Sequence, residues 1–132
     1  MFKPGEVAYT AGTSGVIYCV LDRLTHDDQN RVNLFAHVNH KVDYPRLGML
    51  LCINGTGSMN GWIKKQFAPE GLSYEVMNMM AESIPVGSDG VSILPFGNGA
   101  ERVLGNRETG AVFSGLNFNV NTSAHIFREV QE

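Results

Sequence analysis

The residues best suited to chemistry by type and spacing form the loop Gly12-Thr13-Ser14-Gly15, which joins two short apolar runs. Glycine reaches positive φ without a Cβ clash, so this loop can reverse the chain as a hairpin turn. A glycine-flanked turn can also aim successive backbone N–H groups at one anion, and here two hydroxyl side chains lie at its tip. As an isolated tetrapeptide it favours the plain turn over phosphate binding.

A second glycine- and serine-rich stretch, residues 54–58, leads into a segment with helical spacing. Met59 and Trp62 start one apolar face of that helix. Ser58 is the expected N-cap, with Asn54 as the alternative. Unpaired N–H groups and the helix dipole make such a terminus attractive to anions. By itself, however, the stretch favours a loop followed by a core helix.

The remaining polar candidates suggest little chemistry. The pair Gly97 and Gly99 precedes no helical pattern and is not a dinucleotide-binding fingerprint. The histidines lack the spacing to cysteines or carboxylates that a metal site needs, so we predict no metal ligand and no catalytic residue among them. These histidines are His26, His37, His40 and His125.

The composition is that of one globular domain. The chain has 132 residues, of which 43% are hydrophobic and 17% charged. Its net charge of −3 argues against nucleic acid and anionic membranes as partners, because both favour a basic surface. No apolar run approaches the roughly 18 residues of a membrane span, and no secretion leader opens the chain. Cys19 and Cys52 lie in apolar runs, as buried free thiols do, so we expect a cytoplasmic protein.

The hydrophobic pattern predicts the elements that hold these residues in place. The expected strands are residues 7–10, 16–21, 32–38, 47–53, 91–94 and 110–116, and the expected helices are residues 59–67, 74–83 and 122–132. The first three strands should form an antiparallel unit joined by short turns. The first two do not alternate strictly, so both faces of their sheet should be covered. Ser73 should cap the second helix, and Asn121 or Thr122 the third.

Four stretches, in a fixed order, resemble the C-terminal domain of the FGGY family of carbohydrate kinases. KPGEVAYTAGTSGVIYCV resembles the family's phosphate-binding hairpin, and GMLLCINGTGSMNGW its strand, glycine turn and helix. VSILPFGNGAERVLGN resembles its LPxxxGER stretch, and GAVFSGLNFNVNTSAHIFREVQE its second signature near His125. Within the family, the xylulokinases resemble the chain most. The likeness covers nearly the whole chain and implies that residues 1–132 are part of that domain.

The resemblance implies a fold and an activity. The fold would be α/β, a partial actin-like ATPase (ribonuclease-H-like) domain, with a mixed sheet that opens with an antiparallel hairpin and is flanked by helices. The activity would be transfer of phosphate from ATP, with Mg²⁺, to a hydroxyl of a pentulose such as D-xylulose. Carried over by position, the likeness puts Gly12, Thr13 and Ser14 against the β- and γ-phosphates. It puts Gly57 and Gly61 along the nucleotide.

The sequence departs from the family pattern at two of these places. Relatives often carry a longer polar residue where this chain has Gly61, and the neighbouring Asn60 is the expected substitute. The compact GER of the family is one residue longer here, Gly99 to Arg102, and Glu101 with Arg102 is expected to hold this loop.

The resemblance also implies parts that these residues do not contain. The family's general base is an aspartate just upstream of the phosphate hairpin, and the six residues before the first expected strand include none. The family's sugar-binding N-terminal domain and its adenosine-binding glycine motif are also absent from the sequence. A hydroxyl is not deprotonated efficiently without a base in reach. We therefore expect these 132 residues to be part of a longer protein and to have no kinase activity by themselves.

The alternative function is a non-catalytic interaction or sensor module that keeps the fold. In either case the last helix ends with apolar residues on one side, at Ile126, Phe127 and Val130. An uncovered apolar face predicts a homo-oligomer, or a partner that replaces the missing lobe.

Overall fold

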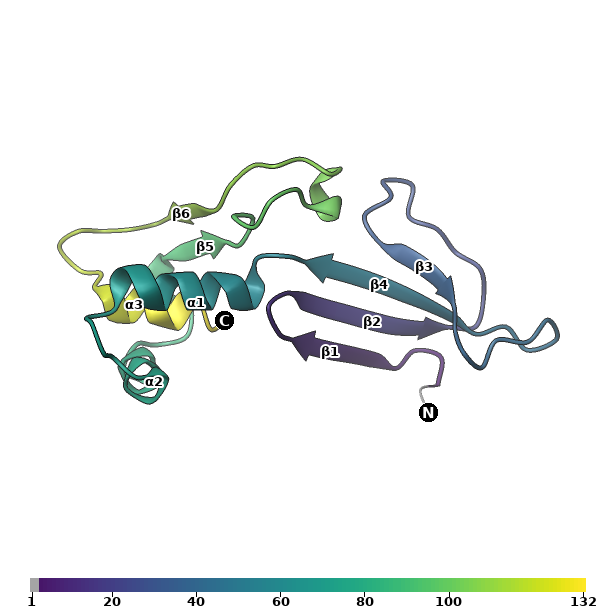
Figure 1. Cartoon of the computed structure of the whole chain (residues 1–132), viewed down its shortest axis with the longest axis horizontal. Helices are drawn as coiled ribbons and strands as arrows, with labels where there is room; N and C mark the ends of the chain where they lie inside the picture. The colour runs from purple at the N-terminus through teal and green to yellow at the C-terminus, as the bar shows by residue number, and fades with distance from the viewer. Residues whose placement is uncertain (1–2) are drawn as a thin grey trace.

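The computed structural model describes residues 3–132, which form two lobes side by side (Figure 1). The sheet lobe contains strands β1 (Val7–Ala11), β2 (Gly15–Leu21), β3 (Asn33–Ala36) and β4 (Leu47–Ile53). The helical lobe contains helices α1 (Thr56–Phe67), α2 (Tyr74–Glu82) and α3 (Ser123–Glu129), strands β5 (Ser92–Leu94) and β6 (Val112–Ser114), and the short turn η1 (Ser88–Gly90). A further turn, η2 (Arg102–Leu104), lies in the β5–β6 connection. None of the helices in residues 3–132 has the length and apolar character of a membrane span.

The four strands of the sheet lobe pair in the order β1-β2-β4-β3. β1 and β2 form a hairpin in which Ala11 pairs with Gly15, and β4 pairs along the whole of β2. The predicted unit of three consecutive strands is therefore wrong, because β4 lies between β2 and β3. Its uninterrupted apolar run suits a central position. Every pair in the described residues is antiparallel, so the sheet expected to be mixed is antiparallel throughout.

The helical lobe holds the hydrophobic core. It is built by all three helices and β5, from Ile63, Met77, Ala81, Ile93, Ile126 and Phe127. Phe127 is fully buried and Ile126 is 8% exposed. The expectation that α3 leaves its apolar side uncovered is therefore wrong for both residues, because α3 packs between α1 and α2.

Two of the expected helix caps are confirmed. The Ser73 hydroxyl accepts a hydrogen bond from the Val76 N–H at 3.2 Å and so caps α2. Thr122 caps α3, and His125 completes the cap because its Nδ1 accepts the Thr122 N–H at 3.0 Å.

The sheet lobe is not covered on both faces, contrary to the prediction. Val7, Tyr9 and Ile17 are 59%, 65% and 42% exposed. No element within residues 3–132 packs over these side chains deeply enough to bury them. Cys19 and Cys52 are free thiols, as expected, but both are half-buried, not fully buried.

Candidate functional site

The loop between β1 and β2 lies against the first turn of α1 (Figure 1). The Ser58 N–H donates to the Thr13 carbonyl at 3.0 Å, and the Gly12 N–H donates to the Ser14 carbonyl at 3.0 Å. A Cβ at Gly57 would lie 1.9 Å from the Gly12 carbonyl oxygen. Only glycine permits that approach. Tertiary structure thus brings the two glycine-rich stretches of the sequence into direct contact.

The glycines of this loop are needed for close packing and not for the direction of the turn. Neither Gly12 nor Gly15 has a positive φ, so the expectation that they reverse the chain in that way is wrong. A Cβ at Gly15 would lie 2.8 Å from Cγ2 of Thr56, the first residue of α1. The small residue therefore lets the hairpin dock on the helix end.

The docked loop leaves donors available to an anion. Within residues 3–132, the backbone N–H groups of Thr13 and Ser14 donate to no protein acceptor. The same is true of the Thr56 and Gly57 N–H groups in the first turn of α1. The Gly57 Cβ position lies 3.3 Å from the Thr13 nitrogen, so the two sets of donors adjoin. Adjoining unpaired N–H groups with hydroxyls beside them suit the oxygens of a phosphate group.

Neither Ser58 nor Asn54 is the N-cap of α1, so both predictions for this position are wrong. The N-cap is Gly55, and no side chain caps the helix. A Cβ there would lie 1.6 Å from the Pro95 carbonyl oxygen, which excludes a capping side chain at this position. The Ser58 hydroxyl instead donates to the Asn54 carbonyl at 3.2 Å, inside the first turn.

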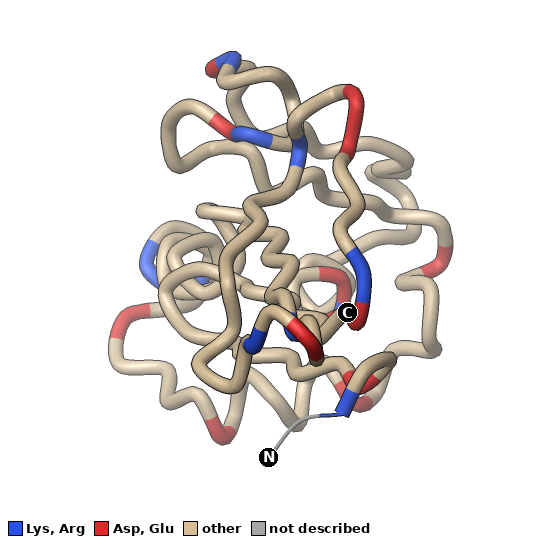
Figure 2. The backbone as a smooth tube through the Cα atoms, turned by 90° about the vertical axis from the view of Figure 1, so that its right-hand side faces the viewer, with Lys and Arg blue, Asp and Glu red and all other residues tan. Residues whose placement is uncertain are grey.

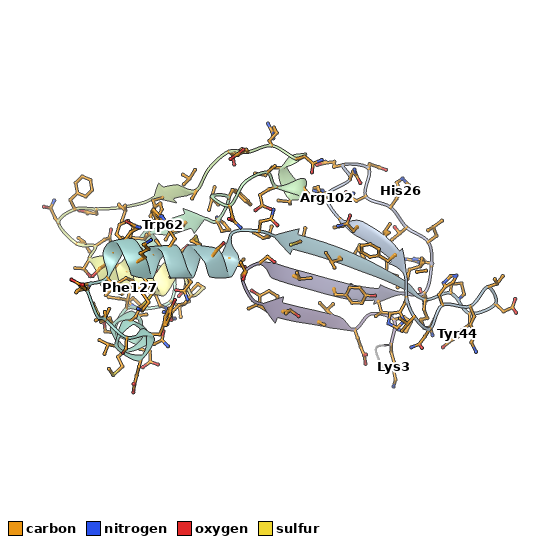
Figure 3. The ribbon with its side chains drawn as sticks, viewed as in Figure 1. Lys3, His26, Tyr44, Trp62, Arg102 and Phe127 are labelled. Atoms are coloured by element: carbon orange, nitrogen blue, oxygen red, sulfur yellow. The ribbon has the colours of Figure 1, made fainter. Side chains whose placement is uncertain are left out.

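A third segment, residues 95–102, holds the turn between β4 and α1. The Asn54 N–H donates to Oε1 of the fully buried Glu101 at 2.9 Å, and its amide nitrogen donates to the Ala100 carbonyl at 3.0 Å. The Arg102 guanidinium binds Asn30 in the loop before β3, at the junction of the two lobes (Figure 3). These contacts agree with the expectation that Glu101 and Arg102 hold the loop.

The other predicted nucleotide residues lie along α1. Gly57 and Gly61 are four positions apart and so share one face of the helix. The nearest atom to a Cβ at Gly61 would be the Tyr74 hydroxyl at 4.0 Å, so this position is open. Asn60, directly before Gly61, lies three positions after Gly57 on the same side of the helix. Its Oδ1 is buried and has no hydrogen-bond partner among the described residues.

The sequence alone did not point to Lys64 and Tyr74, which lie at the far end of this face of α1. The Lys64 ammonium lies 4.8 Å from the centre of the Tyr74 ring, next to the Gly61 position. Lys64 falls three positions after Gly61, a helical spacing that was readable from the sequence. Tyr74 begins the next helix, so only the tertiary structure brings it beside Lys64.

A separate cleft of about 380 Å³ opens on a different side of α1. Its walls include Met59 and Trp62 of α1, with Pro95, Asn98 and Ala111 opposite. Trp62, labelled in Figure 3, also packs edge-on against Phe67, with ring centres 5.7 Å apart. The cleft includes neither the hairpin loop nor Gly57, so it is a different surface from the N–H cluster.

Charged groups do not gather into a basic surface. In the view of Figure 2, basic and acidic positions are scattered over the molecule. No group of three or more potential metal-binding side chains occurs in the described residues. His125 is 6% exposed, and because Nδ1 accepts the Thr122 N–H, Nε2 carries the proton and donates to Asp89 at 3.2 Å. Its role is therefore to join α3 to the η1 turn.

No family model matches the chain. Among curated proteins, a gluconokinase of Bacillus licheniformis is 29% identical over 140 residues, which cover 98% of this chain and 26% of the relative. A xylulose kinase of Bacillus subtilis is 28% identical over 146 residues, covering 98% of this chain and 28% of the relative. The chain thus spans about a quarter of the length of the curated relatives that it matches.

Solved structures agree with these matches. A xylulose kinase from Rhodospirillum rubrum superposes with a TM-score of 0.82 at 26% identity, over 98% of this chain and 25% of that one. A Plasmodium falciparum glycerol kinase with ADP gives 0.75 at 20% identity, over 98% and 25%. The fold class expected from the sequence, a partial actin-like ATPase domain, is confirmed. Gluconokinases and xylulose kinases match alike, so the expected preference for xylulokinases gains no support.

Proposed function

We propose that this chain is the ATP-binding part of an FGGY-family sugar kinase, which transfers phosphate from ATP to a sugar hydroxyl. A pentulose such as D-xylulose is one substrate class, and a sugar acid such as gluconate is the other, because both kinds of kinase resemble the chain equally. The observation that carries the proposal is the hairpin loop docked on α1, where Gly12 and Gly57 meet and unpaired N–H groups adjoin.

The chemistry of phosphoryl transfer suits this arrangement. The reaction depends mainly on positioning and on stabilising charge over the phosphate oxygens. In our proposal, the Thr13 and Ser14 N–H groups and hydroxyls bind the β- and γ-phosphates, and the Gly57 N–H assists them. Mg²⁺ would enter bound to ATP and would neutralise part of the phosphate charge.

The nucleoside would lie along the glycine face of α1. From Gly57 to Lys64 the helix rises about 10 Å, a length that suits the span from a nucleotide's phosphates to its base. Gly61 leaves this path open. Tyr74 and Lys64 at its end would contact the base by stacking and by charge, in place of the longer residue that the family carries at position 61. Asn60 is the second contact that we propose.

The sugar and its general base would come from kinase sequence outside these 132 residues. No carboxylate lies in the hairpin loop or in the first turn of α1 to accept a hydroxyl proton. We therefore expect the 132 residues to bind ATP without phosphorylating a sugar. The alternative, a non-catalytic module of the same fold, predicts that ATP binding is absent or does not depend on Thr13.

The test is calorimetric titration of the chain with ATP, with and without Mg²⁺. Thr13→Ala removes one hydroxyl and is expected to weaken ATP binding about 10-fold, as loss of a charge-assisted hydrogen bond does. Thr25→Ala, at an exposed position of the loop before β3, is the matched control and should change nothing. Unchanged affinity in Thr13→Ala would remove the loop from the site.

A further inference from the structure

The first turn of α1 has no side-chain cap of its own. The Ser73 hydroxyl caps α2, and Thr122 with His125 caps α3, whereas no side chain caps α1. The residues that enter α1, from Gly55 to Gly57, include two glycines, which restrict φ and ψ less than other residues do. The directions of the N–H groups in this turn must therefore be fixed by contacts from other parts of the chain.

Asn54, the residue directly before the N-cap, receives three such contacts. Its N–H donates to Oε1 of Glu101 at 2.9 Å, and its side-chain amide donates to the Ala100 carbonyl at 3.0 Å. Its carbonyl accepts the side-chain amide of Asn98 at 3.0 Å. All three partners lie within residues 98–101, so this short segment holds Asn54 in place.

Glu101 is itself held firmly enough to act as an anchor. Its N–H donates to the Arg107 carbonyl at 3.0 Å. Its carbonyl accepts the N–H groups of Leu104 and Asn106 at 3.1 and 2.9 Å. The side chain is fully buried, so it has no free space in which to change its rotamer. Oε1 is therefore kept in one place opposite the Asn54 N–H.

Packing alone does not explain a carboxylate at this position. Oε2 of Glu101 is buried and has no hydrogen-bond partner among the described residues. None of the ion pairs within residues 3–132 includes Glu101. An unpaired buried oxygen is unfavourable, and an apolar side chain of similar volume would avoid that cost. The hydrogen bond from the Asn54 N–H to Oε1 is the contact that needs the carboxylate.

We propose that Glu101 is a positioning residue of the phosphate site. Oε1 fixes the Asn54 N–H and, through the two residues that follow Asn54, sets the directions in which the Thr56 and Gly57 N–H groups point. Glu101 touches no nucleotide in this arrangement. The backbone hydrogen bonds of Glu101 are enough to hold its own loop, whereas positioning these donors requires its side chain. The inference rests on the proposed function, in which the donors of this turn bind the phosphates of ATP.

Two variants of similar size separate the hydrogen bond from packing and charge. Glu101→Met removes the acceptor, and Glu101→Gln keeps an oxygen acceptor but removes the charge. We expect Glu101→Met to shift the Thr56 and Gly57 signals in amide NMR spectra and to weaken ATP binding about 10-fold in calorimetric titration. Glu101→Gln should match the wild type in both measurements. The Gly61 signal, one turn further along α1, is the internal control and should stay unchanged.

A measurement on the wild-type chain needs no variant. The Asn54 N–H is hydrogen-bonded to a buried carboxylate, whereas the Thr56 N–H donates to no acceptor in residues 3–132. Amide hydrogen exchange should therefore be slower at Asn54 than at Thr56. Equal exchange at the two amides overturns the proposal, and this test remains valid if Glu101→Met does not fold.

The outcomes distinguish positioning from a purely structural role. A structural role predicts lower thermal stability of Glu101→Met, with unchanged Thr56 and Gly57 signals and unchanged ATP affinity of the folded protein, and that result overturns the proposal. Equal loss of ATP binding in Glu101→Gln and Glu101→Met also overturns it, because the charge would then be what matters. A wild-type chain that binds no ATP contradicts the proposed function instead. In that case the amide signals alone decide whether Glu101 positions the donors.

Discussion

The helical lobe and the sheet lobe differ in where their apolar side chains end up. Ile63 of α1 is fully buried among residues from three helices and a strand, while Ile17 of β2 is 42% exposed. The same residue type therefore contributes to a closed core in one lobe and to an open surface in the other. The helical lobe therefore contains a closed hydrophobic core, whereas the sheet lobe, which carries the hairpin loop, leaves apolar side chains open to solvent.

Those contacts are few and specific. The hairpin loop is held to α1 through the Ser58 N–H and the close approach of Gly57 to Gly12. The loop before β3 is held by Arg102. The proposed phosphate site thus lies at the boundary between a well-packed lobe and a poorly packed one, and it forms only when the two are in contact.

The largest expected effect compares one residue type in the two lobes. Ile63→Ala should lower the free energy of unfolding by about 2–5 kcal/mol, because it leaves a cavity in the hydrophobic core of the helical lobe. Ile17→Ala should cost less than about 1.5 kcal/mol at concentrations where the chain is monomeric, because half of this side chain is already in water. Urea unfolding followed by circular dichroism measures both, and equal losses would contradict the contrast between the lobes.

The next effect tests the contact between the lobes with two glycines of one helix. Gly57→Ala puts a methyl group 1.9 Å from the Gly12 carbonyl and should cost about 1–3 kcal/mol of stability by overpacking, together with most of any ATP binding. Gly61→Ala is the control for stability, since the nearest atom would be 4.0 Å away and alanine favours a helix by about 1 kcal/mol. Thermal unfolding of both variants and ATP titration of Gly57→Ala check this. A Gly57→Ala protein as stable as Gly61→Ala would mean that the loop does not dock on α1.

The smallest effect is a pH dependence confined to the sheet lobe. Hydrogen bonds from Arg31 hold the pKa of the partly buried Asp27 carboxyl well below its usual value. A carboxyl with a lowered pKa in the folded state contributes its full stabilisation well above its unfolded pKa of about 3.9 and loses it progressively as pH falls through the folded pKa. Asp27→Asn should therefore be slightly less stable than wild type near pH 6, and this difference should narrow as the pH falls towards about 2. Denaturant unfolding at both pH values measures the difference, and a gap that does not narrow in acid would exclude this cause.

Much of the architecture was predictable because it depends on local pattern. The hairpin strands, β4 and the three helices were expected near their observed positions, and Ser73 and Thr122 were expected as caps. The N-cap of α1 was not, because the Pro95 carbonyl occupies the space next to Gly55 and comes from a segment distant in sequence. The order of the strands was missed for the same reason. Pairing between β2 and β4 depends on apolar contacts that no local turn encodes.

The loop Gly12-Thr13-Ser14-Gly15 shows how much can be inferred from the sequence alone. Its residue types and its order relative to three other stretches determined a hairpin, a fold class and a hypothesis of phosphate binding. Tertiary structure alone decided that Gly12 and Gly15 are small to admit the end of α1, and that Tyr74 lies beside Gly61. It alone also decided that α3 is covered and the sheet is open. Steric approach and burial depend on which segments meet in space, and the linear pattern of one chain does not contain that information.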